Sequence, residues 1–454
     1  MSSLAERSCA LFLSGGLLFV GLSGCQLLVS DELRSGVGES CAKDDDCQAA
    51  RCASGLCAAS CGSASDCPSP SICTSAAVCE IPLKVGFVYV GVAADEGWTL
   101  THEQGRREAA AKLPFLQTDF ESNIFLPKDI ENVVDKFVLE KGANVIVGIS
   151  FSQREAIRLA AEKYPNVKFL ICSGNETGPN LGTYFARMEQ AYFIAGYVAA
   201  RATKTKRLGF VGSYMTPEVV RHANAFTRGA RRAEPSVVVE VRWEGFWFDV
   251  DPPMAGQYNE TRLANQLIDT GCDVLAHNMD NERVNRAVEA ARLAGKNVYS
   301  VGNDNRDACN AGPTSCLGTS YWSWGALYTQ IFEDMHRRRW DPSIAINDDI
   351  TANPATSTIG FAVNTAVTGP DISIAANELL ASLAKPGGGH LPFTGPFCST
   401  GQRAACVAEG ETISDGELRT MCWFVEGLVE KTDPNDPTSP DRAAVVPEKC
   451  LTQQ

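Results

Sequence analysis

The sequence predicts an α/β fold with parallel sheets, arranged as two similar lobes behind a small cysteine-rich segment. Short apolar runs alternate with stretches of helical periodicity over residues 82–384, and this alternation is typical of parallel sheets covered by helices. Around ten strand candidates over about 280 residues exceed what one compact lobe holds, which favours two lobes.

The strand candidates are bounded by turn-forming residues. They lie at 85–90, 145–149, 167–172, 181–185, 208–212, 237–241, 274–277, 298–302, 317–319 and 358–363. Helical patterns lie between them, for example at 152–163, 259–270 and 283–294. We place the boundary between the lobes at the basic polar stretch 203–207, just before a new strand.

Charge and cysteine content limit the classes of function. The 40 basic and 54 acidic residues give a net charge of −14, which argues against a nucleic-acid partner. Ten of the 18 cysteines fall in the first 79 residues. That clustering indicates an oxidising compartment and therefore an exported protein.

The N-terminus has the features of an export signal. Residues 10–22 form an apolar stretch too short to span a bilayer comfortably. It ends in LSGC at 22–25, which resembles a bacterial lipobox, so we expect residues 1–25 to be a lipoprotein signal peptide with Cys25 lipidated. Multiple acyl chains anchor such a protein firmly in a membrane. The alternative is an ordinary signal peptide with an incidental Cys25.

Residues 26–80 are expected to form a tether followed by duplicated disulfide repeats. Cysteines lie at 41, 47, 52 and 57, then at 61, 67, 73 and 79, and the second cysteine of each set follows an Asp. The nearly uniform spacing and the lack of His favour disulfides over a zinc site, with two bridges inside each half as the natural pairing. The segment is interpreted as a stalk or a small protein-binding knob.

The remaining cysteines fall into two groups. Cys172 and Cys272 lie in or beside strands and are expected to be buried thiols. Local bridges are expected for 309 with 316, 398 with 406, and 422 with 450. Residues 431–454 are expected to be an irregular tail, because 431–443 are rich in Pro and Asp.

The first predicted strand leads into an acidic loop and a polar helix over residues 84–106. Ligands bind outside the carboxyl ends of parallel strands, so Trp98 offers a stacking surface there and Asp95 a hydrogen-bond acceptor. The alternative is a packed loop aromatic beside a helix N-cap. Aromatic residues also follow other predicted strands: Phe151, Trp243, Trp247, Tyr321, Trp322 and Trp324. This recurrence favours a ligand cleft over a set of core aromatics.

Several motifs resemble the basic membrane lipoproteins, the nucleoside-binding substrate-binding proteins of ABC transporters. They are DEGW at 95–98 with HEQGR at 102–106, QAYFIAGY at 190–197, GFVG at 209–212, PEVV at 217–220, NAFTRGA at 224–230, WEGFWFD at 243–249, PFTGP at 392–396 and LRTMCWFVEG at 418–427. The resemblance covers residues 83–428. It implies a type I periplasmic-binding-protein fold over 82–430, in which two Rossmann-like lobes joined by a multi-segment hinge close on a ligand.

The resemblance also implies roles for individual residues. Nucleoside-binding members sandwich the base between two Phe side chains, and the corresponding positions here are Trp98 and Trp247. Asp304 matches an acidic group that binds ribose hydroxyls, but the Lys usual after the strand at 319–320 is absent. The two Trp residues and the missing Lys resemble the subgroup that takes free purine bases.

Other candidates lie at the carboxyl ends of predicted strands. Asp95, Asn278 and Asp280 could pair with the polar edge of a purine, and turn chemistry is the alternative for the last two. Trp322, Ser150 and Phe151 could line the same pocket. For Trp322, packing against Trp324 is the alternative.

We therefore expect a membrane-anchored solute-binding protein of the cell envelope that delivers a purine base or nucleoside to an ABC permease. It needs no cofactor or metal and performs no covalent chemistry. An enzyme on the same scaffold is the second reading, but no Gly-x-Ser-x-Gly elbow stands out and the five His residues are scattered. A surface sensor or adhesin that uses the cysteine-rich segment is the third.

Overall fold

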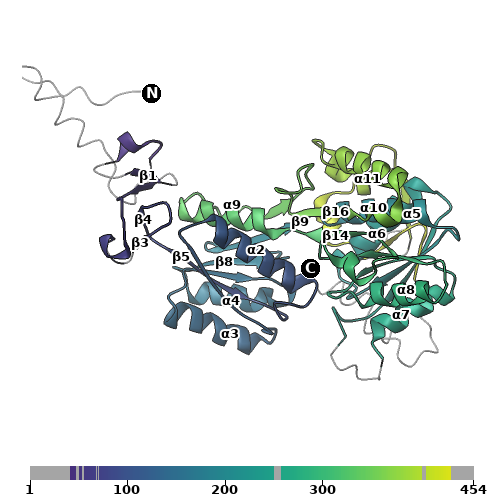
Figure 1. Cartoon of the computed structure of the whole chain (residues 1–454), viewed down its shortest axis with the longest axis horizontal. Helices are drawn as coiled ribbons and strands as arrows, with labels where there is room; N and C mark the ends of the chain where they lie inside the picture. Colours follow the sequence, from purple (N-terminus) through teal and green to yellow (C-terminus); the bar gives the residue numbers. More distant parts are fainter. Residues whose placement is uncertain are drawn as a thin grey trace, which may run out of the picture. The chain divides into compact units, whose positions relative to one another are not determined.

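The structure is a computed structural model that describes residues 41–47, 51–53, 56–67, 69, 71–249, 257–400 and 405–430 (Figure 1). The expected signal peptide, Cys25, most of the tether and the C-terminal tail lie outside these residues. The chain divides into two compact units at the bond between Ile81 and Pro82, and each is described by itself. Among the described residues, no helix combines the length and apolar character needed to cross a bilayer.

The N-terminal unit consists of two similar disulfide-linked halves. Strands β1 (Arg51–Ala53) and β2 (Leu56–Ala58) pair in the first half, and β3 (Ile72–Cys73) and β4 (Cys79–Glu80) pair in the second. In each half the first cysteine bonds the third and the second bonds the fourth: 41–52 and 47–57, then 61–73 and 67–79. The expected two bridges per half are confirmed, and they occupy the sulfurs that could otherwise hold a metal.

Each half contains the same short 3₁₀ turn, Asp44–Asp46 and Ala64–Asp66. The Asp66 carboxylate accepts hydrogen bonds from the backbone N–H groups of Gly62 and Ser63 at 2.7 and 2.8 Å, and Asp46 does the same with residues 42 and 43. These bonds lower the pKa of both carboxyls. The Asp before the second cysteine therefore closes the turn in both halves, as expected for a duplication.

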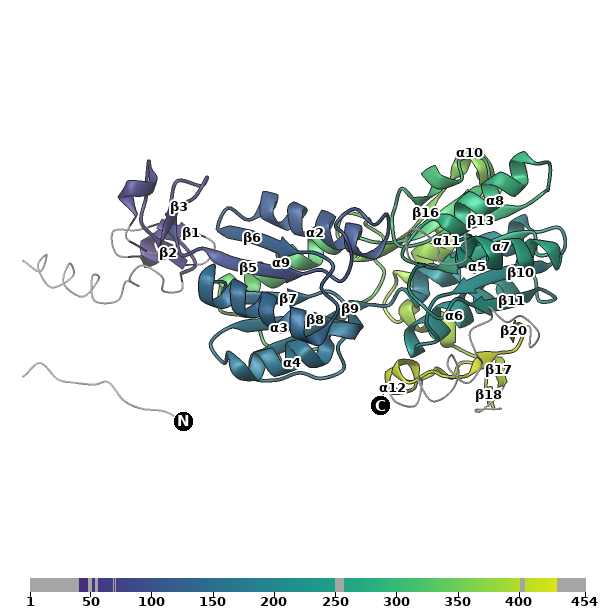
Figure 2. The same cartoon turned by 90° about the horizontal axis from the view of Figure 1, so that it is seen from below.

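The first sheet of the main unit has six parallel strands in the order β15-β9-β8-β7-β5-β6. Their bounds are β5 (Leu83–Val88), β6 (Leu116–Glu121), β7 (Val145–Gly148), β8 (Lys168–Cys172), β9 (Leu181–Ala186) and β15 (Ile346–Asp348). Helices α2 (Trp98–Lys112) and α9 (Trp324–His336) cover one face, and α3 (Pro127–Asp135) and α4 (Arg154–Lys163) cover the other (Figures 1 and 2).

The second sheet has seven strands in the order β16-β14-β13-β12-β10-β11-β20, and only β16 runs antiparallel. Their bounds are β10 (Arg207–Gly212), β11 (Val238–Trp243), β12 (Val274–Asn278), β13 (Tyr299–Gly302), β14 (Cys316–Trp322), β16 (Ile359–Val363) and β20 (Leu428–Glu430). Helices α5 (Glu189–Ala202) and α6 (Pro217–Ala233) lie on one face, and α7 (Asn259–Asp269) and α8 (Arg283–Leu293) on the other. Helices α10 (Thr365–Thr368) and α11 (Pro370–Leu383) follow β16.

A short C-terminal region packs beside α6. It contains β17 (Phe397–Thr400), β18 (Cys406–Val407), β19 (Phe424–Val425) and α12 (Asp415–Arg419). The expected bridges 309–316 and 398–406 are present, and Cys172 and Cys272 are buried free thiols as expected. Cys422 is disulfide-bonded, but its expected partner Cys450 lies outside the described residues.

The expected boundary between the lobes at 203–207 is wrong. Helix α5 already belongs to the second lobe, because it packs so closely on α6 that a Cβ on Gly196 would lie 1.8 Å from the carbonyl oxygen of Phe226. The chain therefore crosses between β9 and α5, at residues 187–188. Residues 203–207 form a turn inside the second lobe, where Asp273 accepts hydrogen bonds from the backbone N–H groups of Lys204 and Thr205.

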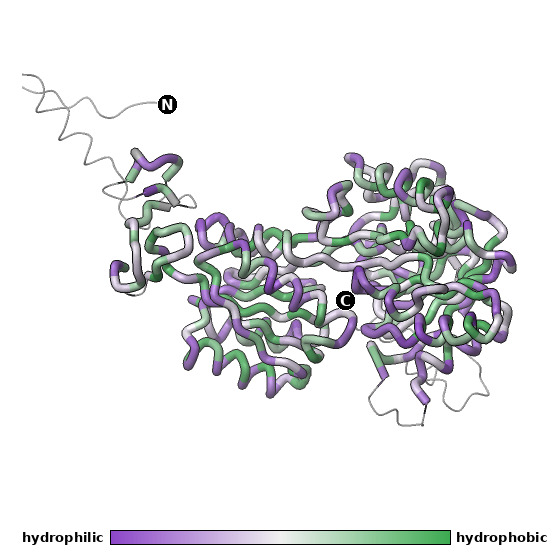
Figure 3. Tube along the Cα trace, in the orientation of Figure 1, coloured by the Kyte–Doolittle hydropathy of each residue, from purple (hydrophilic) through white to green (hydrophobic). Residues whose placement is uncertain are grey.

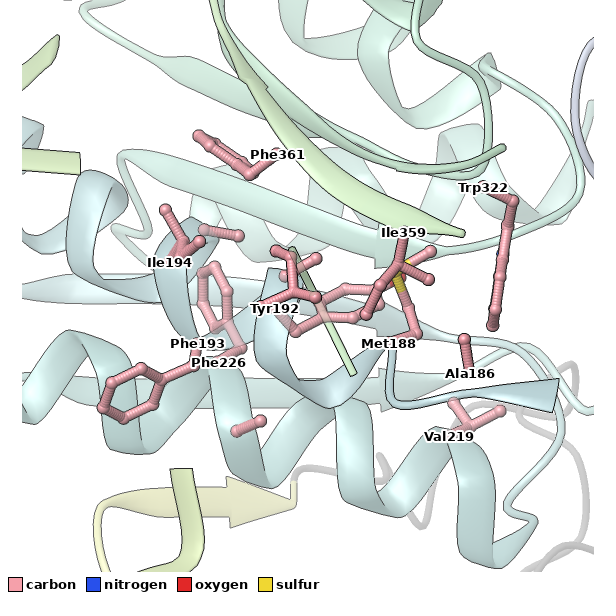
Figure 4. Close-up of a cluster of buried hydrophobic side chains, with 14 of the residues drawn as sticks. Ala186, Met188, Tyr192, Phe193, Ile194, Val219, Phe226, Trp322, Ile359 and Phe361 are labelled. Carbon is pink, nitrogen blue, oxygen red and sulfur yellow. The ribbon is translucent and has the colours of Figure 1, made fainter. Parts of the chain in front are cut away.

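The chain crosses between the sheets twice more. After β14 it enters α9, which packs on α2 of the first lobe, and β15 then pairs with β9 before the chain returns to β16. Three segments therefore connect the two lobes, and they form the multi-segment hinge that the family resemblance implies. Apolar residues concentrate along the strands (Figure 3). A continuous core from Met188 through Phe193 and Phe226 reaches Trp322 at its edge (Figure 4).

All ten predicted strands are present, but β6 and β15 of the first sheet, β20 of the second sheet and the short strands β17 to β19 were not predicted. In β6 only Leu116 is buried, and β15 has three half-buried residues, so neither edge strand carries an apolar run. Tyr321 and Trp322 lie within β14 rather than after it, and Trp324 begins α9.

Candidate ligand-binding site

A pocket lies where the carboxyl ends of strands from both sheets meet. It is lined by Val90, Trp98, Ser150, Phe151, Ser173, Glu218, Trp247, Phe248, Asn278, Asp280, Asp304 and Trp322. Most of these residues follow a parallel strand directly or begin the next helix, which is where open α/β sheets bind ligands. Its volume of about 50 Å³ exceeds what one ordered water needs.

A second hollow adjoins this pocket and has a volume of about 160 Å³. The two share Phe151, Ser173, Glu218 and Trp247. The second hollow adds further polar side chains, and the residues specific to it include Asn175, Thr183, Thr216, Arg221, Asn347 and Arg419. Together the two cavities offer an aromatic inner chamber and a polar outer chamber.

Trp98 is held in a fixed orientation at the start of α2. Its indole Nε1 donates a hydrogen bond to the carbonyl oxygen of Ile149 at 2.8 Å, and its ring meets Trp322 edge-on with centroids 5.4 Å apart. Trp322 in turn stacks on the buried ring of Trp324, with centroids 4.7 Å apart and an interplanar angle of 8°. Packing against Trp324 and lining the pocket were alternatives for Trp322. In the structure this side chain stacks on Trp324 and also lines the pocket.

Trp247 enters the pocket from the second lobe, on the loop after β11. Its carbonyl oxygen accepts a hydrogen bond from the backbone N–H of Asp280 at 3.1 Å, and its ring packs against Tyr214 with centroids 5.8 Å apart. Trp98 and Trp247 therefore line one pocket from opposite lobes, which is the arrangement that a sandwich requires.

Three acidic side chains line the pocket. Asp304 is 3% exposed, and its Oδ1 accepts a hydrogen bond from Trp322 Nε1 at 3.0 Å. Burial raises the pKa of Asp304 and of Asp280, and the Asp304 carboxyl adds to the rise at Asp280. Burial also raises the pKa of Glu218 to about 7, against the opposing charge of Arg221.

Asp304 and Ser173 have left-handed backbone conformations, with φ of 60° and 56°. Such conformations cost of order 1–3 kcal/mol for residues other than glycine, and they gather at binding sites.

Asp95 does not line the pocket. Its Oδ1 accepts from the backbone N–H groups of Gly97 and Leu100, and its Oδ2 accepts from that of Thr99, at 2.9–3.1 Å. The carboxylate thus holds the first turn of α2 in the manner of a cap, although the N-cap residue itself is Gly97. Asp95 positions Trp98, and contact of its carboxylate with a ligand stays a prediction.

Asn278 lines the pocket, but its polar atoms already have partners in the second lobe. Its Oδ1 accepts a hydrogen bond from the Ser213 hydroxyl at 2.9 Å, and its Nδ2 lies 3.3 Å from both the Tyr192 hydroxyl and His222 Nδ1. Its side chain therefore links Ser213, Tyr192 and His222 on the second-lobe side of the pocket.

The sequence interpretation missed Val90, Ser173, Glu218 and Phe248. Glu218 and Ser173 had a detectable signal, since each follows a predicted strand within a few residues. Polar residues at those positions also serve as turn and cap residues, and this ambiguity concealed them. Phe248 lies next to Trp247 in a motif that was noted only for its Trp.

Contacts at the pocket join the two lobes. Arg286 Nη2 of α8 lies 2.5 Å from Glu96 Oε1 of the first-lobe loop. A Cβ on Gly97 would lie 2.4 Å from the carbonyl oxygen of Asp280, so only glycine permits this close approach without a shift. The two lobes therefore contact each other beside the pocket in this structure.

Residues 83–366, which contain every lining residue of this pocket, match the sequence model of Bmp, described as ABC transporter substrate-binding protein PnrA-like. The chain belongs to the Bmp family. Proteins of this family bind solutes and are not enzymes.

Two relatives are similar to large parts of this chain. A Brucella abortus purine-binding protein is 29% identical over 354 residues, covering 78% of this chain and 94% of the relative. A Haloferax volcanii protein named for glucose binding in an ABC transporter is 32% identical over 259 residues, covering 57% of this chain. This chain spans 62% of the length of that relative.

Solved structures share the fold of this Bmp protein. An ABC transporter solute-binding protein from Conexibacter woesei has a TM-score of 0.53 at 18% identity, covering 66% of this chain and 95% of its own. A transcriptional activator from Bacillus halodurans has a TM-score of 0.54 at 18% identity, covering 67% and 98%. These likenesses establish the two-lobed fold.

Proposed function

We propose that this protein captures a purine base or purine nucleoside between Trp98 and Trp247 and delivers it to an ABC permease. The observation that carries the proposal is that these two indole rings line one pocket from opposite lobes. A planar bicyclic ligand between them would gain stacking on both faces. The Brucella abortus relative, named for purine binding, supports the same class of ligand.

Capture would combine stacking with recognition of the polar edge of the base. Asp280, Asp304 and Ser150 lie around the two rings and supply acceptors and a hydroxyl at the pocket wall. Closure of the lobes would remove the ligand from water, which strengthens these polar contacts. A ribose would fit the polar outer hollow, where Asn347 and Thr216 offer hydrogen-bonding groups.

Anchoring belongs to the same proposal. We propose that Cys25 carries lipid and holds the protein at the membrane of the cell envelope, with the disulfide-linked halves as a spacer or a protein-binding knob. Mass spectrometry of the mature protein from its native membrane tests this directly. A mass for the N-terminal peptide that equals the unmodified sequence contradicts the anchor.

A sugar is the second candidate, because a relative is named for glucose binding and aromatic faces beside carboxylates also suit pyranose rings. Isothermal titration with adenine, hypoxanthine, adenosine, guanosine and glucose separates the two classes. The proposal expects saturable binding of at least one purine compound and none of glucose. Binding of glucose alone overturns it, and binding of neither class would favour a surface sensor or adhesin with another ligand.

A further inference from the structure

We propose that the pocket selects purines that carry a positive charge on the ring, such as N-alkylated purine cations, over the neutral parent compounds. This inference rests on the proposed function and names the class of purine. It is argued from the lining of the pocket, in which aromatic side chains lie beside the three acidic side chains of Asp280, Asp304 and Glu218.

The charges around the pocket are unbalanced. Asp280, Asp304 and Glu218 line it, and none of its described lining residues is Lys, Arg or His. Arg221 opposes the charge of Glu218 from the neighbouring hollow. Asp280 instead faces further acids, namely Asp304, Asp95 and Glu218. A neutral ligand does not change this excess of acidic groups, whereas a bound cation compensates part of their negative charge.

One carboxylate oxygen lacks a partner. Asp304 Oδ1 is held by Trp322, but Asp304 Oδ2 is buried without a hydrogen-bond donor among the described residues. Leaving a buried acceptor unsatisfied costs about 1–3 kcal/mol, and more for a charged group. Since the side chain is 3% exposed and lines the pocket, a ligand that brings a donor or positive charge to Oδ2 satisfies the carboxylate when it is ionised.

The walls add a second attraction for a cation. Trp98, Trp247 and Trp322 line the pocket, and indole rings attract cations more strongly than the rings of Phe or Tyr. Phe151 also lines it, but the Arg154 guanidinium already lies 3.7 Å from the centroid of its ring. A neutral purine gains stacking alone. An N-alkylated purine keeps the same ring and adds both the cation–π attraction and the attraction to the acids.

Proton exchange should accompany such binding. The groups that face Asp304 are the acids Asp280, Glu282, Asp95 and Glu218, the hydroxyl of Tyr192 and the indole Nε1 of Trp322. His277 is kept neutral because burial lowers its pKa to about 3. Burial and these acids raise the pKa of Asp304, which favours a proton on the carboxyl in the free protein. A bound cation favours the ionised form, so protons are released and affinity falls as the pH is lowered.

The test compares each parent nucleoside with its cation by isothermal titration at slightly acidic pH: guanosine with 7-methylguanosine, and adenosine with 1-methyladenosine. The inference expects about tenfold tighter binding of the cations, with proton release measured from the dependence of the binding enthalpy on the buffer. It expects Asp280→Asn and Asp304→Asn each to reduce this preference strongly. Asp341→Asn, an exposed acid outside the pocket, is the control and should retain it.

Each outcome decides between the claims. If the neutral nucleosides bind and the cations bind no better, the inference fails and the proposed function stands. A preference that survives in both Asn variants also overturns the inference, because the acids would not be its cause. If none of the four compounds binds, the nucleoside part of the proposed function fails and the inference with it.

Discussion

Trp322 Nε1 donates a hydrogen bond to Asp304 Oδ1 at 3.0 Å, and this contact joins the aromatic wall of the pocket to its acidic floor. Trp322 ends β14 and Asp304 follows β13, so two neighbouring parallel strands position the pair. The bond leaves Asp304 Oδ2 available for a ligand.

Replacing Trp322 by Phe should destabilise the protein more than the same change at Trp324. Both indoles are buried, but Trp324 Nε1 has no hydrogen-bond partner among the described residues. Trp322→Phe therefore loses ring volume and a hydrogen bond, whereas Trp324→Phe loses only volume. We expect a difference of about 1–2 kcal/mol in the free energy of unfolding, measured with urea. Equal losses would contradict a structural role for the bond.

Adding a methyl group at Gly97 should weaken ligand binding. Its Cβ would lie 2.4 Å from the carbonyl oxygen of Asp280 in the opposite lobe, so the lobes of Gly97→Ala should be held apart. We expect at least about tenfold weaker binding and an unfolding midpoint close to that of the parent protein. Titration calorimetry and thermal unfolding measure the two effects.

Two variants serve as controls for Gly97→Ala. A Cβ on Gly178 would meet only Leu181 at an ordinary 3.5 Å, so Gly178→Ala should bind normally. Arg286→Ala removes the ion pair with Glu96, whose side chains are 48% and 47% exposed. Exposed pairs contribute about 0–1 kcal/mol, and the loss of affinity should be correspondingly small. A larger effect from Arg286→Ala than from Gly97→Ala would contradict this ranking.

Sequence reasoning located most of this pocket for a definite physical reason. In a parallel sheet, the carboxyl ends of the strands share one edge, so residues after different predicted strands converge there. Trp98, Ser150 and Trp247 were identified in this way, whereas Asp304 came from the family resemblance alone, and the contact of all four with a ligand remains a proposal. Trp247 needed the family resemblance as well, because its loop has no regular pattern.

The ambiguous and wrong predictions also have physical causes. Asp95 has the residue type and position of both a helix cap and a ligand acceptor, and only the coordinates show three backbone N–H groups on its carboxylate. The boundary at 203–207 was misplaced because a polar turn resembles a linker. Helix α5 belongs to the second lobe because it packs closely on α6 at Gly196 and Gly229. Such tertiary contacts leave no local pattern in the sequence.

Stability of the ligand-free protein should fall as the pH rises from about 7 to about 8, because below this range the lowered pKa values of the buried His102, His222 and His277 give the opposite slope. Burial raises the pKa of Glu218 to about 7 and, together with repulsion from Glu260, that of Glu244 to about 8. Between the ordinary pKa and these values the folded protein binds more protons than the unfolded chain, so unfolding becomes easier as the pH increases. Thermal unfolding of Glu244→Gln should show a weaker pH dependence, while Glu140→Gln at an exposed site should not. A stability that increases over this range contradicts the account.

Asn347 should distinguish nucleosides from free bases. It lines the outer hollow but not the inner pocket, so Asn347→Ala should weaken adenosine binding by about threefold to tenfold through one lost hydrogen bond. Adenine binding should stay unchanged. Equal losses for both compounds would indicate that the outer hollow does not hold the sugar.

The affinity of the two tryptophan variants for purines tests the central claim most directly. The ligand is the purine compound that binds the parent protein most tightly, and the method is isothermal titration of Trp98→Ala and Trp247→Ala. Trp423→Ala is the control, because its ring packs against Phe397 away from the pocket. Loss of a stacking contact of about 1–3 kcal/mol predicts about 5- to 150-fold weaker binding for each pocket variant and none for the control. Unchanged affinity in both pocket variants would contradict a purine held between Trp98 and Trp247.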